Sequence, residues 1–132
     1  MKYITHKRFK GLSISGNVNL PAMTDCSEAG NVIYYNGNAI CVSTSHIAHQ
    51  YFARNDDGNG MLRGKLTRSI QNVLNTRDES YQDRWDKVWS DPVCQKYKRK
   101  EHADHWLWNH DFYNADILTL KHIAHIVGVK EG

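Results

Sequence analysis

The first part of the chain alternates apolar and polar side chains. Between residues 11 and 20 the two kinds fall on opposite parities, Leu12, Ile14, Val18 and Leu20 against Ser13, Ser15, Asn17 and Asn19. A period of two residues is typical of a half-buried β-strand, because successive side chains of a strand point to opposite faces. Pro21 ends the pattern, since it has no amide hydrogen for a strand ladder. We therefore predict a strand over these residues.

A second β signal lies between residues 32 and 42, where two apolar runs flank Asn36-Gly37. Asn-Gly favours a type I′ hairpin turn, because both central residues of that turn need a positive φ. A two-residue turn predicts two cross-strand pairs, Ile33 with Ile40 and Tyr34 with Ala39. With a further strand at 3–9, we expect an N-terminal antiparallel β-meander of three or four strands.

After residue 44 the apolar side chains are spaced three and four residues apart, which is typical of helices. We predict a C-terminal bundle of four or five helices, with these apolar stripes among them: Leu62, Leu66, Ile70, Val73 and Leu74; Tyr81, Trp85, Val88 and Trp89; Ile117, Leu120, Ile123, Ala124 and Val127. The expected end signals are a capping box at Ser80 and Asp83, Pro92 at a first helical position, and Gly128 as a C-cap. The pattern predicts a single α+β domain over residues 1–132, β-rich at 1–44 and helical at 45–132.

Composition narrows the class of protein. The 132 residues include 17 Lys and Arg against 14 Asp and Glu, for a net charge of +3, and 11% are aromatic. Such a chain is too balanced in charge and too aromatic to be disordered. Three cysteines leave an odd thiol in any disulfide scheme, which favours a reducing compartment. The apolar runs are shorter than a membrane span and no secretion signal is recognisable, so we expect a cytoplasmic protein with no membrane partner.

Two basic clusters are candidates for binding phosphate. Residues 61–77 contain Arg63, Lys65, Arg68 and Arg77 without any acidic residue. The second cluster comprises Lys96, Lys98, Arg99 and Lys100, with Tyr97 among them. Cations that reach outward neutralise phosphate, and a neighbouring aromatic ring can stack on a base. Arg54 borders the polar loop at 55–60, which could close over a ligand. The alternative interpretation is that these cations belong to ordinary solvated helix faces.

Aromatic residues are concentrated between Tyr81 and Tyr113, a segment that holds every Trp of the chain. On a helix, the three side chains of Trp106-Leu107-Trp108 would spread over about 200°. Trp106 or Trp108 is then expected to face outward, where an exposed Trp anchors an interface or stacks on a base. The alternative is burial in the core, which is the usual place of large aromatic side chains.

A third candidate is the His-rich segment from His102 to Asp111, which also contains Asp104, His105 and His110. Imidazole and carboxylate groups at close spacing can hold zinc or another divalent metal. The spacing matches no standard metal signature, so we assign neither a metal nor a cofactor. A metal-dependent hydrolase or nuclease that uses this cluster remains one alternative function.

The segments at 51–58, 85–89 and 104–111 resemble small, poorly characterised proteins of phages and prophages of Gram-positive bacteria. The resemblance covers most of the chain and transfers no catalytic residue. It implies an accessory factor that acts in the host cytoplasm, such as a replication helper, a regulator or an inhibitor of host defence. Factors of the last kind commonly bind a defence protein or a nucleotide signal.

From these observations we expect a non-enzymatic binding protein of phage type that captures a phosphate-bearing ligand, either a nucleotide or a nucleic acid, to counteract a bacterial defence system. The expected ligand-binding residues are Arg54, Arg63, Lys65, Arg68, Lys96, Tyr97, Lys98, Arg99, Trp106 and Trp108. An alternative is a protein-interaction module, or an inhibitor of a host protein, that acts through the aromatic surface at 106–108. That module could also form a homo-oligomer.

Overall fold

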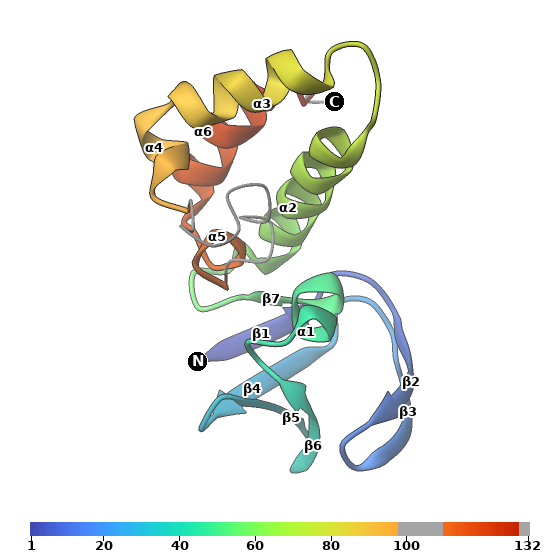
Figure 1. The fold of residues 1–132 in the computed structure, drawn as a ribbon. Helices are drawn as coiled ribbons and strands as arrows, with labels where there is room; N and C mark the ends of the chain where they lie inside the picture. The colour runs from blue at the N-terminus through green and yellow to red at the C-terminus, as the bar shows by residue number, and fades with distance from the viewer. Residues whose placement is uncertain (98–109, 130–132) are drawn as a thin grey trace. The chain divides into compact units, whose positions relative to one another are not determined.

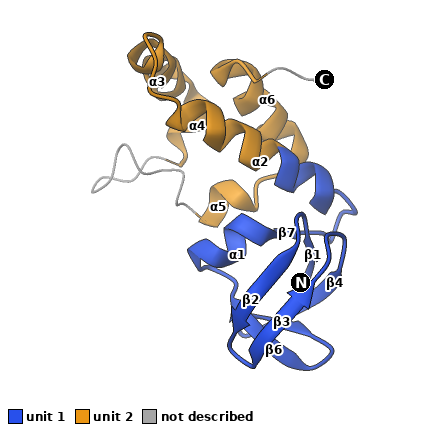
Figure 2. Cartoon of the chain, turned by 90° about the vertical axis from the view of Figure 1, so that its right-hand side faces the viewer, with its two compact units in different colours: residues 1–65 blue, residues 66–132 orange. Residues whose placement is uncertain are grey.

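The computed structural model describes residues 1–97 and 110–129. It confirms the α+β class, with antiparallel strands in the N-terminal part followed by helices (Figure 1). The chain divides into two compact units, Met1–Lys65 and Leu66–Gly132 (Figure 2). Residues 45–65, which the sequence pattern assigned to the helical part, thus belong to the unit that holds the strands.

The first unit contains more strands than the three or four expected. Its elements are β1 (Lys2–Thr5), β2 (Phe9–Ser13), β3 (Gly16–Leu20), β4 (Asp25–Ala29), β5 (Val32–Tyr35), β6 (Asn38–Val42), α1 (His46–Tyr51), β7 (Phe52–Arg54) and the first residues of α2 (Gly60–Asn75). Five strands form an antiparallel sheet in the order β6-β5-β4-β1-β7, and β2 pairs with β3 in a separate hairpin. The sequence pattern missed β4 because it is short and carries few apolar residues, and it missed β7 because this strand of three residues follows α1 directly.

The predicted strand at 11–20 is instead part of the β2–β3 hairpin. Ser13 pairs with Gly16, so the chain reverses over two residues, and Leu12 then lies opposite Asn17. Across such a turn, residues of equal parity on the two strands face opposite sides. Leu12 is therefore exposed, whereas Leu20, of the same parity, is buried. Apolar and polar side chains do alternate along residues 11–20, but the alternation continues through the turn at 14–15, so the pattern alone cannot show where the chain reverses.

The Asn36-Gly37 turn is confirmed, with φ values of 50° and 79° that a type I′ turn requires. The predicted pairing of Tyr34 with Ala39 is also confirmed. The pairing of Ile33 with Ile40 is wrong, because an irregularity between Ile33 and Tyr34 shifts the register and places Ile33 opposite Cys41.

The core of the first unit lies between the hairpin, the sheet and α1. The buried side chains of this core are Tyr3, Phe9, Leu20, Cys26, Ile33, Ile40, Cys41, Ala48 and Phe52. Phe9 of the hairpin packs against Phe52 of β7 and edge-on against Tyr51 of α1, with ring centroids 5.7 and 5.1 Å apart. Burying each large apolar side chain stabilises the fold by about 1.5–3 kcal/mol, so the inner face of the hairpin is a major contributor.

The start of α2 approaches β1 closely because Gly60 and Gly64, four residues apart, share one helix face. A Cβ at Gly60 would collide with Ile4, and a Cβ at Gly64 would collide with His6. His6 is buried there and its Nε2 lies 3.3 Å from the carbonyl of His49. His49 is also buried.

The second unit contains the rest of α2 with α3 (Tyr81–Ser90), α4 (Pro92–Gln95), α5 (His110–Tyr113) and α6 (Ile117–Val127). Its core matches the predicted stripes, with these side chains buried: Leu66, Ile70, Leu74, Trp85, Val88, Leu120, Ile123, Ala124 and Val127. Gly128 is the predicted left-handed C-cap, with φ 83°. The capping box is wrong, since Ser80 makes no side-chain cap bond. Asp91 is the N-cap of the next helix, α4. Its carboxylate also accepts a hydrogen bond from His122 of α6, with 2.8 Å between Nε2 and Oδ2.

We predict that Gly64→Ala destabilises the first unit by about 1–3 kcal/mol, because the new methyl group overpacks against buried His6. Helix propensity alone would give the opposite sign, since Ala is about 1 kcal/mol better than Gly inside a helix. Urea unfolding monitored by circular dichroism measures the difference. Asn72→Ala, at an exposed position of α2, is the matched control and should not lower stability.

Candidate functional site

Arg63 is not available to a phosphate, which corrects the first basic cluster. Its side chain is 0% exposed and forms an ion pair with Asp57, with 2.7 Å between Nη2 and Oδ2. The same guanidinium donates to the backbone carbonyl of Arg54. Arg63 therefore uses its donors to hold the 55–60 loop, which contains Asp57, onto the start of α2.

Tyr97 is also unsuited to its predicted role. Its side chain is buried in the second unit, and its ring packs edge-on against Phe112 with centroids 6.0 Å apart. Burial, with smaller effects from nearby acidic groups, raises the pKa of its phenol. A ring enclosed in this way cannot stack on a base.

Four other predicted ligand residues lie within the described part of the chain. Lys65 and Lys96 are exposed, and Arg54 and Arg68 are half-buried. Lys65 and Arg54 belong to the first unit, whereas Arg68 and Lys96 belong to the second. Their ligand-binding role stays a prediction. Four further candidates lie outside the described residues, namely Lys98, Arg99, Trp106 and Trp108, as does most of the His-rich segment at 102–111.

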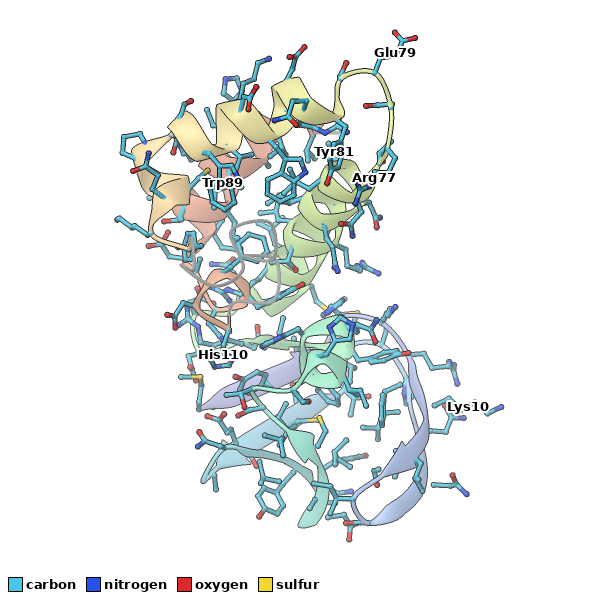
Figure 3. All side chains as sticks on the ribbon, viewed as in Figure 1. Lys10, Arg77, Glu79, Tyr81, Trp89 and His110 are labelled. Carbon is cyan, nitrogen blue, oxygen red and sulfur yellow. The ribbon has the colours of Figure 1, made fainter. Side chains whose placement is uncertain are left out.

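The structure shows another basic surface, the outer face of the β2–β3 hairpin. The pairs Lys10–Asn19 and Leu12–Asn17 place these side chains on one face, and all of them are exposed. Arg8 joins the same face, since its Nη1 donates to Oδ1 of Asn19 at 2.9 Å. Figure 3 shows Lys10 extending away from the ribbon. We call these five residues the hairpin face.

A signal for this surface is present in the sequence. The first 24 residues contain four cations and no acidic residue. The first unit holds seven Lys and Arg against four Asp and Glu, whereas residues 66–132 hold ten of each. The whole net charge of +3 therefore resides in the unit that carries the hairpin face.

The hairpin is held at both ends, which fixes the geometry of its outer face. Near its base, Phe9 and Leu20 are buried in the core. At its tip, the amides of Ile14 and Ser15 donate to carbonyls of β6 at 2.9 and 3.1 Å. A hollow of about 320 Å³ lies among Lys10, Gly11, Asn17, Val18 and Asn19. A face whose geometry is fixed at both ends loses little entropy when it binds a ligand.

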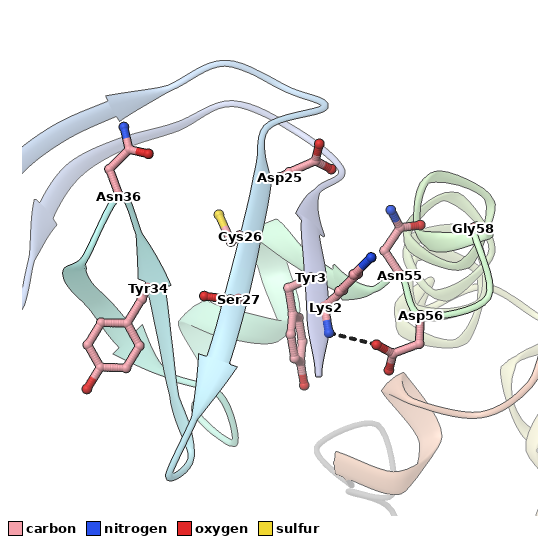
Figure 4. A pocket seen from close by; sticks show the side chains of 10 residues that line it. All are labelled: Lys2, Tyr3, Asp25, Cys26, Ser27, Tyr34, Asn36, Asn55, Asp56 and Gly58. Atoms are coloured by element: carbon pink, nitrogen blue, oxygen red, sulfur yellow. Dashed lines mark hydrogen bonds between the residues drawn. The ribbon is translucent and has the colours of Figure 1, made fainter.

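A larger pocket of about 610 Å³ lies elsewhere on the first unit (Figure 4). Lys2, Ser27 and Tyr34 form its floor, because they stand opposite one another on neighbouring strands β1, β4 and β5. Asp25 shares the floor, two residues before Ser27. The loop that follows β7 supplies another side, which includes Asn55 and Asp56. The pocket is thus a polar hollow with both signs of charge.

The pocket side formed by this loop is ordered by hydrogen bonds. Asp56 Oδ1 accepts from the backbone amide of Lys2 at 2.7 Å, and Asn55 Oδ1 accepts from the amide of Gly60 at 2.8 Å. The amide of Asn55 in turn donates to the carbonyl of Lys2 at 2.8 Å. These contacts tie the loop to β1 and to the start of α2.

The cysteines offer little reactivity at neutral pH. All three thiols are buried, and burial is the largest cause that raises the pKa of Cys26 and Cys41 to about 11 and that of Cys94 to about 12. A protonated thiol is a poor nucleophile and a poor metal ligand. Within residues 1–97 and 110–129, no three His, Cys, Asp or Glu side chains gather in a metal-binding arrangement.

Among these described residues, no helix has the length and apolar character needed to cross a membrane.

We predict an acid-sensitive contribution of Asp57 to stability. The hydrogen bond from Arg63 is the main cause that lowers the pKa of Asp57 below its ordinary value of 3.8. The ion pair therefore stabilises the fold above pH 3.8, and this contribution is lost as the pH falls further. Because Asp57 is partly exposed, Asp57→Asn should cost about 1–2 kcal/mol at pH 7.

Urea unfolding of both proteins at pH 7 and at pH 3 measures this contribution. The difference between wild type and Asp57→Asn should shrink at the lower pH, because below pH 3.8 the Asp57 carboxyl of the unfolded chain takes up a proton while that of the folded protein stays ionised. Asp25→Asn, which changes an exposed carboxylate of β4 outside this ion pair, should leave the stability at pH 7 unchanged. An equal cost of the two substitutions at pH 7 would contradict the assignment.

Comparisons of the chain with protein-family models, with curated proteins and with solved structures found no match.

Proposed function

We propose that this protein binds nucleic acid through the hairpin face. The observation that carries the proposal is the outward clustering of Arg8 and Lys10 with Asn17 and Asn19 on a ribbon free of acidic residues. The proposal keeps the phosphate-bearing ligand expected from the sequence, but it moves the contact surface from the helices to the strands.

Electrostatics favours a polyanion at this face. Phosphate groups attract exposed cations, and the release of their counterions supplies much of the binding free energy. Arg8 and Lys10 are exposed, and half-buried Lys7 lies beside them with its Nζ 4.7 Å from the Tyr51 ring centroid. No carboxylate of residues 1–24 opposes these three cations.

The polar side chains beside the cations suit base edges. A two-stranded ribbon fits the major groove of a duplex, where Asn pairs with adenine and Arg with guanine. The bond from Arg8 engages the carbonyl oxygen of the Asn19 side chain, so the amide nitrogen of Asn19 stays available as a donor. Leu12 is 75% exposed on the same face and could meet the methyl group of thymine.

The length of the ribbon favours a polynucleotide over a single nucleotide. Strands of five residues extend over about 16 Å, which spans several phosphates of one strand. The resemblance to phage proteins adds a biological setting: a nucleic-acid-binding accessory factor in the host cytoplasm, including one that counteracts a defence system. A nucleotide signal remains the competing ligand, and a protein partner at the 106–108 aromatic segment remains the competing function.

The test is fluorescence anisotropy with a short labelled duplex, the matching single strand and a labelled mononucleotide at increasing salt. We expect the duplex to bind, with affinity that falls as salt rises. Arg8→Ala and Lys10→Ala should each weaken binding about fivefold and reduce the slope of log affinity against log salt by about one phosphate contact.

Three single substitutions serve as comparisons. Lys121→Ala removes an exposed cation of α6 and should bind like the wild type. Lys65→Ala and Lys96→Ala test the helical clusters. If these two weaken binding while Arg8→Ala and Lys10→Ala do not, the hairpin face is the wrong surface. If the wild type binds neither polynucleotide at low salt, the proposed function is wrong.

A further inference from the structure

The 610 Å³ pocket of the first unit has a volume within the range usual for small-molecule sites. It shares none of its lining residues with the hairpin face, so its chemistry can be considered separately. The floor is preformed by the sheet register, since Lys2 pairs with Ser27 and Ser27 pairs with Tyr34. The contacts of Asn55 and Asp56 fix the adjoining loop.

Charges of both signs meet in this pocket. In Figure 4 the Lys2 side chain extends toward the loop, and the carboxylates of Asp25 and Asp56 lie on either side of it. One carboxylate oxygen of Asp56 is already positioned by the backbone amide of Lys2. The order of charges across the pocket is therefore negative, positive, negative.

This order discriminates among classes of small ligand. A simple anion such as phosphate would meet Lys2 but also two carboxylates, and like charges at close range are costly. A simple amine would meet the carboxylates but also the ammonium group of Lys2. A ligand that carries an ammonium and a carboxylate on neighbouring atoms can pair each of its charges with an opposite one.

We propose that this pocket binds a free α-amino acid. The ammonium group of the ligand is held by Asp25 or Asp56, and its carboxylate is held by Lys2. Tyr34 lines the far end of the floor, two strands away from Lys2. Ser27 and Asn55 add hydrogen-bonding groups between the charged ones.

The test begins with a screen of the twenty standard amino acids against the ¹⁵N-labelled full-length protein by NMR. Binding should shift the amides of Ser27, Tyr34 and Asn55 and leave those of the hairpin face in place. Matched probes then separate the charges: L-phenylalanine against phenethylamine, which lacks the carboxylate, and 3-phenylpropionate, which lacks the amine. We expect each truncated probe to bind about tenfold more weakly, because it leaves one protein charge without its partner.

Variants locate the two charge contacts. Asp56→Asn and Lys2→Gln should each weaken amino-acid binding about tenfold, whereas Glu28→Gln, on the same strand as Asp25 but outside the pocket lining, should not. Asp25→Asn shows whether the second carboxylate shares the ammonium. Circular dichroism of each variant establishes that it is folded.

Three results would overturn the proposal: no amino acid shifts the pocket amides, phenethylamine binds as tightly as phenylalanine, or Asp56→Asn and Lys2→Gln both bind like the wild type. None of them bears on nucleic-acid binding, which is measured with different variants. Conversely, failure of the duplex to bind leaves the amino-acid site intact.

Discussion

Reversal of the chain over Ile14 and Ser15 decides which side chains of the hairpin enter the core. With Ser13 opposite Gly16, the apolar residues Phe9 and Leu20 face inward, and the polar residues of the hairpin face point to solvent. A turn longer by one residue would move every side chain of one strand to the other face. The burial of Phe9 against Phe52 and Tyr51 resists such a slip, so core packing and surface chemistry depend on the same register.

The same inward placement of apolar side chains leaves the first unit with two polar surfaces that differ in charge. The hairpin presents cations and amides, while the outer face of the sheet and the adjoining loop gather Asp25 and Asp56 around Lys2. Both surfaces rest on one core, and neither requires a residue of the second unit. Two small sheets that share one core can therefore carry a basic face and a separate pocket, because each turns its apolar side chains inward.

Sequence reasoning predicted the elements whose signals are local. The Asn36-Gly37 turn, the stripes of α2, α3 and α6, and the Gly128 cap depend on neighbours in the chain, and all are confirmed. Sequence reasoning failed where contacts with residues distant in the chain determine whether a side chain is buried. Arg63 resembles a surface cation until Asp57 and the carbonyl of Arg54 enclose it, and Tyr97 resembles a stacking ring until Phe112 covers it. The hairpin face was missed because its alternating pattern is equally consistent with one continuous strand.

The five residues of the loop between β7 and α2, together with Gly60 at the start of α2, have several structural roles. Asp57 engages Arg63, Asn55 and Asp56 line the pocket, and Gly60 allows α2 to approach Ile4. Exposed polar loops usually accept insertions and deletions, because little depends on their length. Here one added residue would displace the ion pair, the pocket side and the helix start together. The length of this loop is therefore expected to vary less among related chains than its polar composition suggests.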